Sequence, residues 1–191
     1  MLDLRELTRR FAHAGVLEAI YLRPARGLPA VSVASAEALE GRGLAGDRSA
    51  ERPSTMADGS KRQVTLLQAE HVPLIAAWSG HASLDAAVLR RNLVISGLNL
   101  MAARSPFADQ ALQVSIGSTV SLLVTGECAP CSKMEIALGH GGYNALRGHG
   151  GLTARVLAGG IVRVGDPVTV APGEARSDAS IATRLVQGAV R

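Results

Sequence analysis

Short apolar segments rich in β-branched residues recur along this chain, and glycine-containing turns separate them. Runs of about four to eight residues with this composition are typical of β-strands, and glycine or proline between them indicates turns. The sequence predicts strands at residues 15–22, 31–34, 63–67, 112–116, 119–124, 152–157, 160–164 and 168–170, with a further buried strand after Asn92. This series predicts a mainly β fold with a few short helices (α+β), in the form of a closed or partly open β-barrel.

Helical patterns are limited to short segments before and between these strands. Apolar residues at helical spacing indicate a lead-in within residues 1–14 and short helices at 69–78, 84–89 and 134–138. A chain of 191 residues fits one domain, and no shift in composition marks a boundary. We therefore predict one barrel domain at 15–171, followed by a polar tail at 172–191 with a weak helical pattern.

The composition excludes several classes of function. Aromatic residues make up 3% of the chain, which leaves too few stacking platforms for a protein that binds single-stranded nucleic acid. The 20 Lys and Arg residues exceed the 16 Asp and Glu residues but form no basic block, so the positive charge suits an anionic ligand rather than nucleic acid. No apolar run approaches the roughly 18 residues of a membrane span, and the N-terminus lacks the apolar core of a secretory signal. These features predict a cytoplasmic protein that does not enter a membrane.

The two cysteines of the chain, Cys128 and Cys131, are separated by two residues and follow an apolar, β-branched run. Such a pair cannot form a disulfide framework, and in a reducing compartment it indicates redox, metal or sulfur chemistry. A thiolate is a nucleophile, a sulfur carrier and a soft metal ligand. Three chemical interpretations therefore compete: a thioredoxin-like dithiol, a thiolate ligand of a metal or cofactor, and a persulfide carrier.

The surroundings of the cysteine pair bear on these interpretations. The many predicted strands around it do not form the βαβ pattern expected of a thioredoxin-like protein. Polar residues at positions 127, 132 and 133 argue against a role in which both cysteines are buried as small hydrophobic residues. Lys133 and a helix that starts near Ser132 would both favour the thiolate form.

Other polar residues are candidates for binding an anionic ligand. Arg91 and Asn92 stand directly before the buried strand, and arginine makes forked contacts with phosphate or carboxylate. A glycine-dense stretch at 139–151 repeats His-Gly-Gly and can wrap closely around a ligand. Its polar residues are His140, Asn144, Arg147 and His149. The two histidines are nine residues apart, a spacing that does not match a structural zinc site made with the two cysteines.

Several short motifs follow one another in a distinctive order. They are Gly46-Asp47, residues 62–66, residues 91–94 with Gly97-Leu98, residues 116–117, residues 128–131, and residues 154–157 with Gly160 and Gly165-Asp166. In this order and spacing they resemble the MOSC domain, a family named after the C-terminal domain of molybdenum cofactor sulfurases, over about residues 15–171. The resemblance implies a pyruvate-kinase-barrel-like fold. It also implies a cysteine that serves as a sulfur carrier or as the thiolate ligand of molybdenum in a pterin cofactor.

The same resemblance implies roles for individual residues. Cys131, the cysteine preceded by proline, matches the characteristic cysteine of the family and is the expected catalytic residue and molybdenum ligand, with Cys128 as an accessory thiol. The expected cofactor-binding residues, taken from the motifs and from the glycine-dense stretch, are Asp47, Arg91, Asn92, Asn144, Arg147, His149 and Arg155.

The expected function is therefore to bind the molybdopterin cofactor, to carry sulfur on Cys131, or both. The enzymatic version is a two-electron reduction of N-hydroxylated substrates, with electrons from an external donor. A sulfur donor such as a pyridoxal-phosphate cysteine desulfurase is the expected partner of the carrier version. Stand-alone members that act as reductases often have His-Gly-Gly soon after the Gly-Asp motif, whereas this chain has Arg48-Ser49-Ala50 there, so the carrier role stays open. The alternative is a thiol–disulfide oxidoreductase that uses Cys128 and Cys131.

Overall fold

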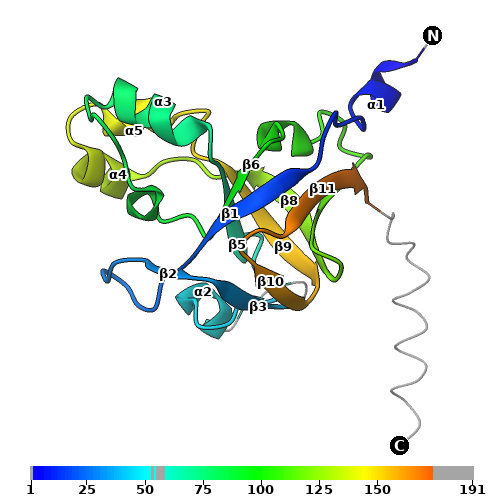
Figure 1. Ribbon diagram of the computed structural model, residues 1–191, viewed down its shortest axis with the longest axis horizontal. Coiled ribbons are helices and arrows are strands. Elements are labelled where there is room, and N and C mark those ends of the chain that lie inside the picture. Colours follow the sequence, from blue (N-terminus) through cyan, green and yellow to red (C-terminus); the bar gives the residue numbers. More distant parts are fainter. Residues whose placement is uncertain (1, 53, 55–58, 174–191) are drawn as a thin grey trace, which may run out of the picture.

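The computed structural model describes residues 2–52, 54 and 59–173, and its centre is a closed barrel of seven strands (Figure 1). The strands follow one another around the barrel in the order β11, β7, β8, β9, β5, β6 and β1, and pairing of β1 with β11 closes it. Their bounds are β1 (Gly15–Leu22), β5 (Val64–Gln68), β6 (Leu93–Ser96), β7 (Leu112–Ile116), β8 (Val120–Glu127), β9 (Leu152–Ala158) and β11 (Pro167–Pro172). The prediction of a mainly β, closed barrel is confirmed.

Four further strands extend the barrel. The short strand β2 (Val31–Val33) pairs with β1, and a separate sheet is formed by β10 (Gly160–Arg163), β3 (Ser35–Leu39) and β4 (Gly43–Leu44). All strand pairs are antiparallel except β5 with β6, which are parallel. A parallel pair needs a crossover connection. Here the chain crosses through α3 (His71–Trp78) and the 3-10 helix η1 (Ala86–Leu89).

Three helices gather beside one end of the barrel and form what we call the helical lobe (Figure 1). They are α3, α4 (Ser132–Leu138) and α5 (Gly142–Leu146). The remaining helices are α1 (Leu4–Leu7), α2 (Arg48–Glu51) and the 3-10 helix η2 (Leu100–Ala103). In the described part of the chain, no helix has the length and apolarity required to span a membrane.

Aliphatic side chains fill the interior, as the low aromatic content requires. In β7, Leu112, Val114 and Ile116 are buried while the residues between them are partly exposed, which is the period of two expected of a barrel strand. Burying one such side chain stabilises the fold by about 1.5–3 kcal/mol. A second cluster lies between the barrel and the helical lobe and consists of Leu67, Ile75, Leu89, Val94, Met134, Leu138 and Leu146.

The predicted strands are present within a few residues of their expected bounds, but five elements were not predicted. These are β3, β4, α2, η2 and α5. Helix α5 lies inside the glycine-dense stretch that sequence reasoning treated as a loop. It starts after Gly141, whose φ is 86°, and the Glu135 carboxylate accepts hydrogen bonds from the backbone N–H groups of Gly141 and Tyr143. The predicted helical pattern of the tail falls at 174–191, outside the described residues.

Candidate functional site

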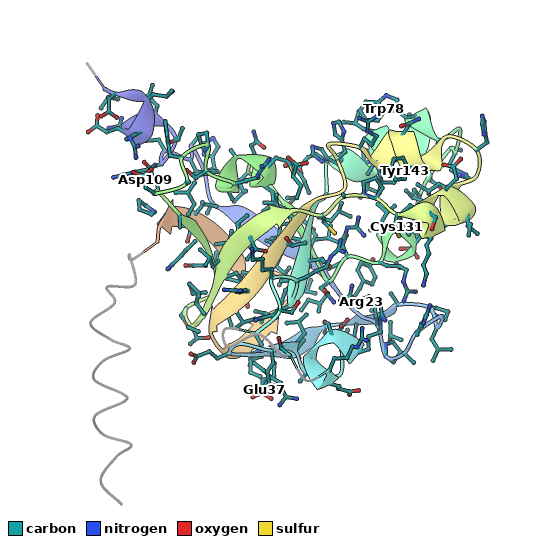
Figure 2. All side chains as sticks on the ribbon, turned by 180° about the vertical axis from the view of Figure 1, so that it is seen from behind. Arg23, Glu37, Trp78, Asp109, Cys131 and Tyr143 are labelled. Atoms are coloured by element: carbon teal, nitrogen blue, oxygen red, sulfur yellow. The ribbon has the colours of Figure 1, made fainter. Side chains whose placement is uncertain are left out.

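The cysteine pair lies where strand β8 leaves the barrel and the chain enters the helical lobe. Cys128 directly follows β8, is 1% exposed, and donates its backbone N–H to the Gly151 carbonyl at 2.8 Å. Cys131 immediately precedes α4, is exposed, and lies on the same side of the molecule as Arg23 (Figure 2). Both thiols are free. The pair is therefore asymmetric: the expectation that the two cysteines are not both buried is met by Cys131, whereas Cys128 is buried.

The buried sulfur of Cys128 has a cationic partner that sequence reasoning did not select. The guanidinium Nη2 of Arg62, an exposed residue just before β5, donates to Cys128 Sγ at 2.9 Å. A hydrogen bond from a charged donor is about twice as strong as a neutral one. Arg62 belongs to a motif of the family resemblance, but its contact with a cysteine 66 residues away could not be predicted from the sequence.

Arg91 connects three segments around the same cysteine. It is 7% exposed, and its guanidinium donates to the carbonyls of Gly150 (2.6 Å), Leu89 (2.8 Å) and Cys128 (3.2 Å). Burial lowers the pKa of the Arg91 guanidinium, and the nearby Cys128 sulfur acts in the opposite direction. These donors hold together the segments at Leu89, Cys128 and Gly150, which we call the wall of the site, and binding of a cofactor anion by Arg91 stays a prediction. Its positive charge remains beside both thiols.

The second His-Gly-Gly repeat packs closely against this wall. A Cβ atom on Gly150 would collide with the Cys128 carbonyl, and one on Gly151 would collide with the Leu66 carbonyl. Gly151 also has a φ of 87°, which favours glycine. The two glycines are therefore explained by close backbone approach within the protein.

Asp47 and Asn92, both predicted to bind cofactor, come together in a buried polar network. Asp47 is 0% exposed and accepts hydrogen bonds from Arg23 Nε at 2.8 Å, from Ser49 Oγ at 2.6 Å and from Asn92 Nδ2 at 2.8 Å. Burial would raise the pKa of the Asp47 carboxyl, but hydrogen bonds from Arg23 and Ser49 and the charge of Arg23 outweigh it and hold the pKa well below its usual range. The carboxylate is thus ionised and fully engaged.

Asn92 is hydrogen-bonded through both its amide oxygen and its amide nitrogen. Its Oδ1 accepts hydrogen bonds from Thr65 Oγ1 at 2.9 Å and from Arg23 Nη2 at 3.0 Å, while its Nδ2 also donates to the Tyr21 carbonyl at 3.0 Å. Asn92 is 0% exposed. We call this set, Arg23, Asp47, Ser49, Thr65 and Asn92, the interior network. It links the ends of β1, β5 and β6 to α2, so Asp47 and Asn92 hold the scaffold.

The remaining predicted residues lie apart from the interior network. Arg155 is on β9, and its Nη2 lies 3.5 Å from the Gly59 carbonyl. Asn144 and Arg147 are exposed, within and just after α5. The His149 ring packs edge-on against His71 and Trp78, with ring centroids 4.7 Å and 4.8 Å away. Among the described residues, no hydrogen bond or ion pair joins the side chains of these four residues to either cysteine.

The residues around Cys131 suit a cofactor that brings most of its own metal ligands. In the part of the chain that the structure describes, no group of three or more His, Cys, Asp or Glu side chains could hold a metal ion. The exposed thiol of Cys131 is a single soft donor of the kind that suits a thiophilic metal. Positive charge for an anionic cofactor comes from Arg62 and Arg91 beside the thiols and from Arg48 and Arg90 near Asp47. The donor set fits a pterin-bound molybdenum better than a metal ion held by protein alone.

Comparisons with known structures show the same fold. The YuaD protein from Bacillus subtilis aligns with a TM-score of 0.71 at 19% identity, over 87% of this chain and 100% of that one. YiiM from Geobacillus stearothermophilus aligns with a TM-score of 0.60 at 18% identity, over 84% of this chain and 75% of that one. YiiM from Escherichia coli gives a TM-score of 0.56 at 19% identity, over 86% and 72% of the two chains.

Comparisons at the level of sequence give one further result. No curated protein matches the chain. The MOSC domain family does match, over residues 53–169, which is more than half of the chain and includes both cysteines, Arg62 and Arg91. The chain therefore belongs to the MOSC domain family, whose members are generally associated with the molybdenum cofactor.

Proposed function

We propose that this MOSC protein carries a sulfur atom on Cys131 as a persulfide and delivers it to the molybdenum cofactor or its apoprotein. The observation that carries the proposal is the asymmetry of the cysteine pair. Cys131 is exposed, whereas Cys128 is 1% exposed and its sulfur is bonded to Arg62. Sulfur exchange requires an accessible nucleophilic sulfur, and Cys131 alone of the two provides it.

The loading step uses no external electrons. The Cys131 thiolate attacks the outer sulfur of a persulfide on a donor, such as a pyridoxal-phosphate cysteine desulfurase. One S–S bond forms at Cys131 as the S–S bond of the donor breaks, and the donor leaves as a thiolate. The free thiols that this step requires persist in a reducing compartment, so we place the protein in the cytoplasm.

The same thiol also suits direct binding of the cofactor. When bound, a molybdenum cofactor would supply two-electron redox chemistry, such as reduction of an N-hydroxylated compound with electrons from an external donor. Cys131 would be its thiolate ligand, and Arg62 and Arg91 would offset its negative charge. Because the donors of Arg91 that contact carbonyls are already used, Arg62 is the better candidate for a direct hydrogen bond to an anionic group.

One set of preparations tests the proposal. The protein is purified from a host grown with ample molybdate, and bound molybdenum, bound pterin and cysteine persulfide are measured. Cys131→Ser and Cys128→Ser are purified in parallel as matched variants. A persulfide on Cys131 after incubation with a cysteine desulfurase and cysteine, lost in Cys131→Ser and kept in Cys128→Ser, supports the carrier.

Two other results would replace it. Stoichiometric molybdenum that is lost only in Cys131→Ser, with no persulfide under any condition, would favour the cofactor-binding reductase. A reversible disulfide between Cys128 and Cys131, with neither persulfide nor cofactor, would favour the thiol–disulfide oxidoreductase instead.

A further inference from the structure

We infer that Arg62 makes the Cys131 site able to accept sulfur from a small sulfur oxoanion of the thiosulfate class. This inference rests on the proposed persulfide role of Cys131 and names a class of donor for it. It assigns to Arg62 the binding of the oxoanion next to the two thiols. The contacts of Arg62, the charges around the cysteines and the chemistry of the donor each bear on it.

The contacts of Arg62 leave most of its guanidinium open. Nη2 donates to Cys128 Sγ at 2.9 Å, and the backbone N–H donates to Ser60 Oγ at 3.1 Å. Within the described residues, Nε and Nη1 of Arg62 have no hydrogen-bond partner, and the side chain is exposed. The Cys128 sulfur therefore occupies one nitrogen of a planar fork, and the other N–H groups have no acceptor among the described residues. A fork of this kind matches the spacing of two oxygens on an oxoanion.

The charges around the two thiols favour an anion. Arg62 donates to Cys128 Sγ at 2.9 Å and Arg91 donates to the Cys128 carbonyl at 3.2 Å, so both guanidinium groups contact the residue three positions before Cys131. The ion pairs among the described residues include neither Arg62 nor Arg91. Two unpaired guanidinium groups therefore create a positive potential at the thiols, which raises the local concentration of anions.

The nearest acidic side chains in the sequence have partners of their own. Glu127, the residue before Cys128, pairs with Arg104 at 2.5 Å. Glu135, on α4, accepts hydrogen bonds from the N–H groups of Gly141 and Tyr143 at 2.9 Å and 2.7 Å. Lys133, two residues after Cys131, is exposed and adds further positive charge.

The transfer step balances without an added oxidant or reductant. The Cys131 thiolate attacks the outer sulfur of thiosulfate, and a new S–S bond forms on Cys131. The S–S bond within thiosulfate breaks, and its electron pair leaves with the sulfonate sulfur as sulfite. Negative charge gathers on the sulfite oxygens as this bond breaks, and the Arg62 guanidinium is placed to stabilise it. A neutral low-mass persulfide has no such oxygens and would gain nothing from Arg62.

Loading from labelled thiosulfate tests the inference. The reduced full-length protein is incubated with thiosulfate that carries a heavy sulfur isotope at the outer position, and mass spectrometry measures the labelled persulfide on each cysteine. We expect the label on Cys131, with loading slowed about tenfold or more in Arg62→Ala because one or more charge-assisted hydrogen bonds are lost. Arg62→Lys should recover part of the rate, because lysine keeps the positive charge but lacks the planar fork of arginine. Arg163→Ala, on β10, removes an exposed arginine elsewhere and should leave the rate unchanged.

A parallel incubation with polysulfide separates failure of the inference from failure of the proposed function. Polysulfide is also an anion but has no oxygens for the guanidinium fork, so its loading of Cys131 should fall much less in Arg62→Ala than loading by thiosulfate does, and it also shows that the variant is folded and its thiol reactive. Loading by polysulfide but not by thiosulfate would overturn the oxoanion inference and leave the carrier standing. Equal loading by thiosulfate in Arg62→Ala, or a label on Cys128, would overturn it as well. No persulfide from either reagent would overturn the proposed function itself.

Discussion

Two clusters in this molecule are built around arginine, and they differ in whether its charge is paired. In the interior network, Arg23 meets the Asp47 carboxylate at 2.8 Å, and the amide and hydroxyl groups around them are hydrogen-bonded to one another. In the second cluster, which we call the thiol site, Arg62 and Arg91 lie beside Cys128 and Cys131 with no carboxylate partner in the described part of the chain.

This difference distinguishes the interior network, which stabilises the fold, from the thiol site, which can bind a ligand. Buried polar groups that satisfy one another fix the arrangement of the strands that carry them, and they have no capacity left for a ligand. Unpaired cations next to an exposed thiol do have that capacity. Three single substitutions and one alkylation experiment test the distinction, and they are described in order of decreasing expected effect.

Removal of the Asp47 carboxylate should give the largest loss of stability. Asp47→Ala leaves the Arg23 guanidinium, 12% exposed, without its counter-charge, and breaking a buried pair in this way costs about 3–5 kcal/mol. Urea unfolding at neutral pH measures the loss. Asp109→Ala, which removes an exposed partner of Arg5, is the control and should leave the unfolding midpoint nearly unchanged.

The pH dependence of this loss has a defined sign. Because the pKa of Asp47 is held below its usual range in the folded protein, its stabilising contribution is present above the unfolded value of about 3.9 and is lost as the pH falls toward the folded value. The gap between the unchanged protein and Asp47→Ala should therefore narrow below about pH 4. A loss comparable to that of Asp109→Ala at neutral pH would mean that the interior network is not the scaffold.

The next effect concerns the glycines that hold the wall of the thiol site. Gly151→Ala places a Cβ against the Leu66 carbonyl and forces a non-glycine residue to a φ of 87°, so we expect a loss of about 3 kcal/mol. Gly148→Ala is a matched control, because its φ is 75° but nothing lies within 4 Å of the added Cβ. It should cost only the backbone term of about 1–2 kcal/mol. Equal losses in the two variants would show that the wall has room to move.

The barrel could be predicted from the sequence, but the partners within the two clusters could not. Alternation of buried and partly exposed residues, as at Leu112, Val114 and Ile116, depends on neighbours in the chain and is visible in the sequence. The pairs Arg62–Cys128 and Arg23–Asp47 join residues 66 and 24 positions apart, and no local pattern reports such contacts. Sequence reasoning could therefore select polar residues near the site without showing which ones the protein already uses.

The two cysteines illustrate the same limit. Polar residues around the pair indicated exposure, and this holds for Cys131. Cys128 is buried where the chain leaves β8: its backbone N–H donates to the Gly151 carbonyl, and its sulfur accepts a hydrogen bond from the Arg62 guanidinium. Helix α5 was missed for a related reason, since the Glu135 side chain caps it from α4 rather than from an adjacent residue.

Alkylation of the native protein tests the asymmetry of the thiol site. A small alkylating reagent should modify Cys131 about 100-fold or more faster than Cys128, because Cys128 is 1% exposed and reacts only when the site opens. Peptide mass spectrometry after a time course measures both rates. In denatured protein the two cysteines should react at similar rates, which serves as the control. Comparable rates in the native protein would remove the basis for assigning the sulfur to Cys131.

The smallest effect should come from His71 and His149, whose rings pack against each other beside the wall of the thiol site. Burial lowers the pKa of His71, and the charge of His149, whose ring is 4.7 Å away, lowers it further, while Glu70 acts in the opposite direction. The unfolded chain then takes up a proton before the folded one as the pH falls, so this contribution to stability is present above about pH 6.5 and decreases below it. His71→Phe keeps a ring against His149 but cannot be protonated. Urea unfolding at about pH 7.5 and about pH 5.5 should therefore show a smaller loss of stability on acidification for His71→Phe than for the unchanged protein.

The control is the same substitution at the exposed His140, which should leave the pH dependence of stability as it is in the unchanged protein. If His71→Phe also leaves the pH dependence of stability unchanged, the histidine pair does not contribute to it. The segment 147–151 is then held by the hydrogen bonds of Arg91 and Cys128, and the wall of the thiol site does not respond to pH through these two histidines.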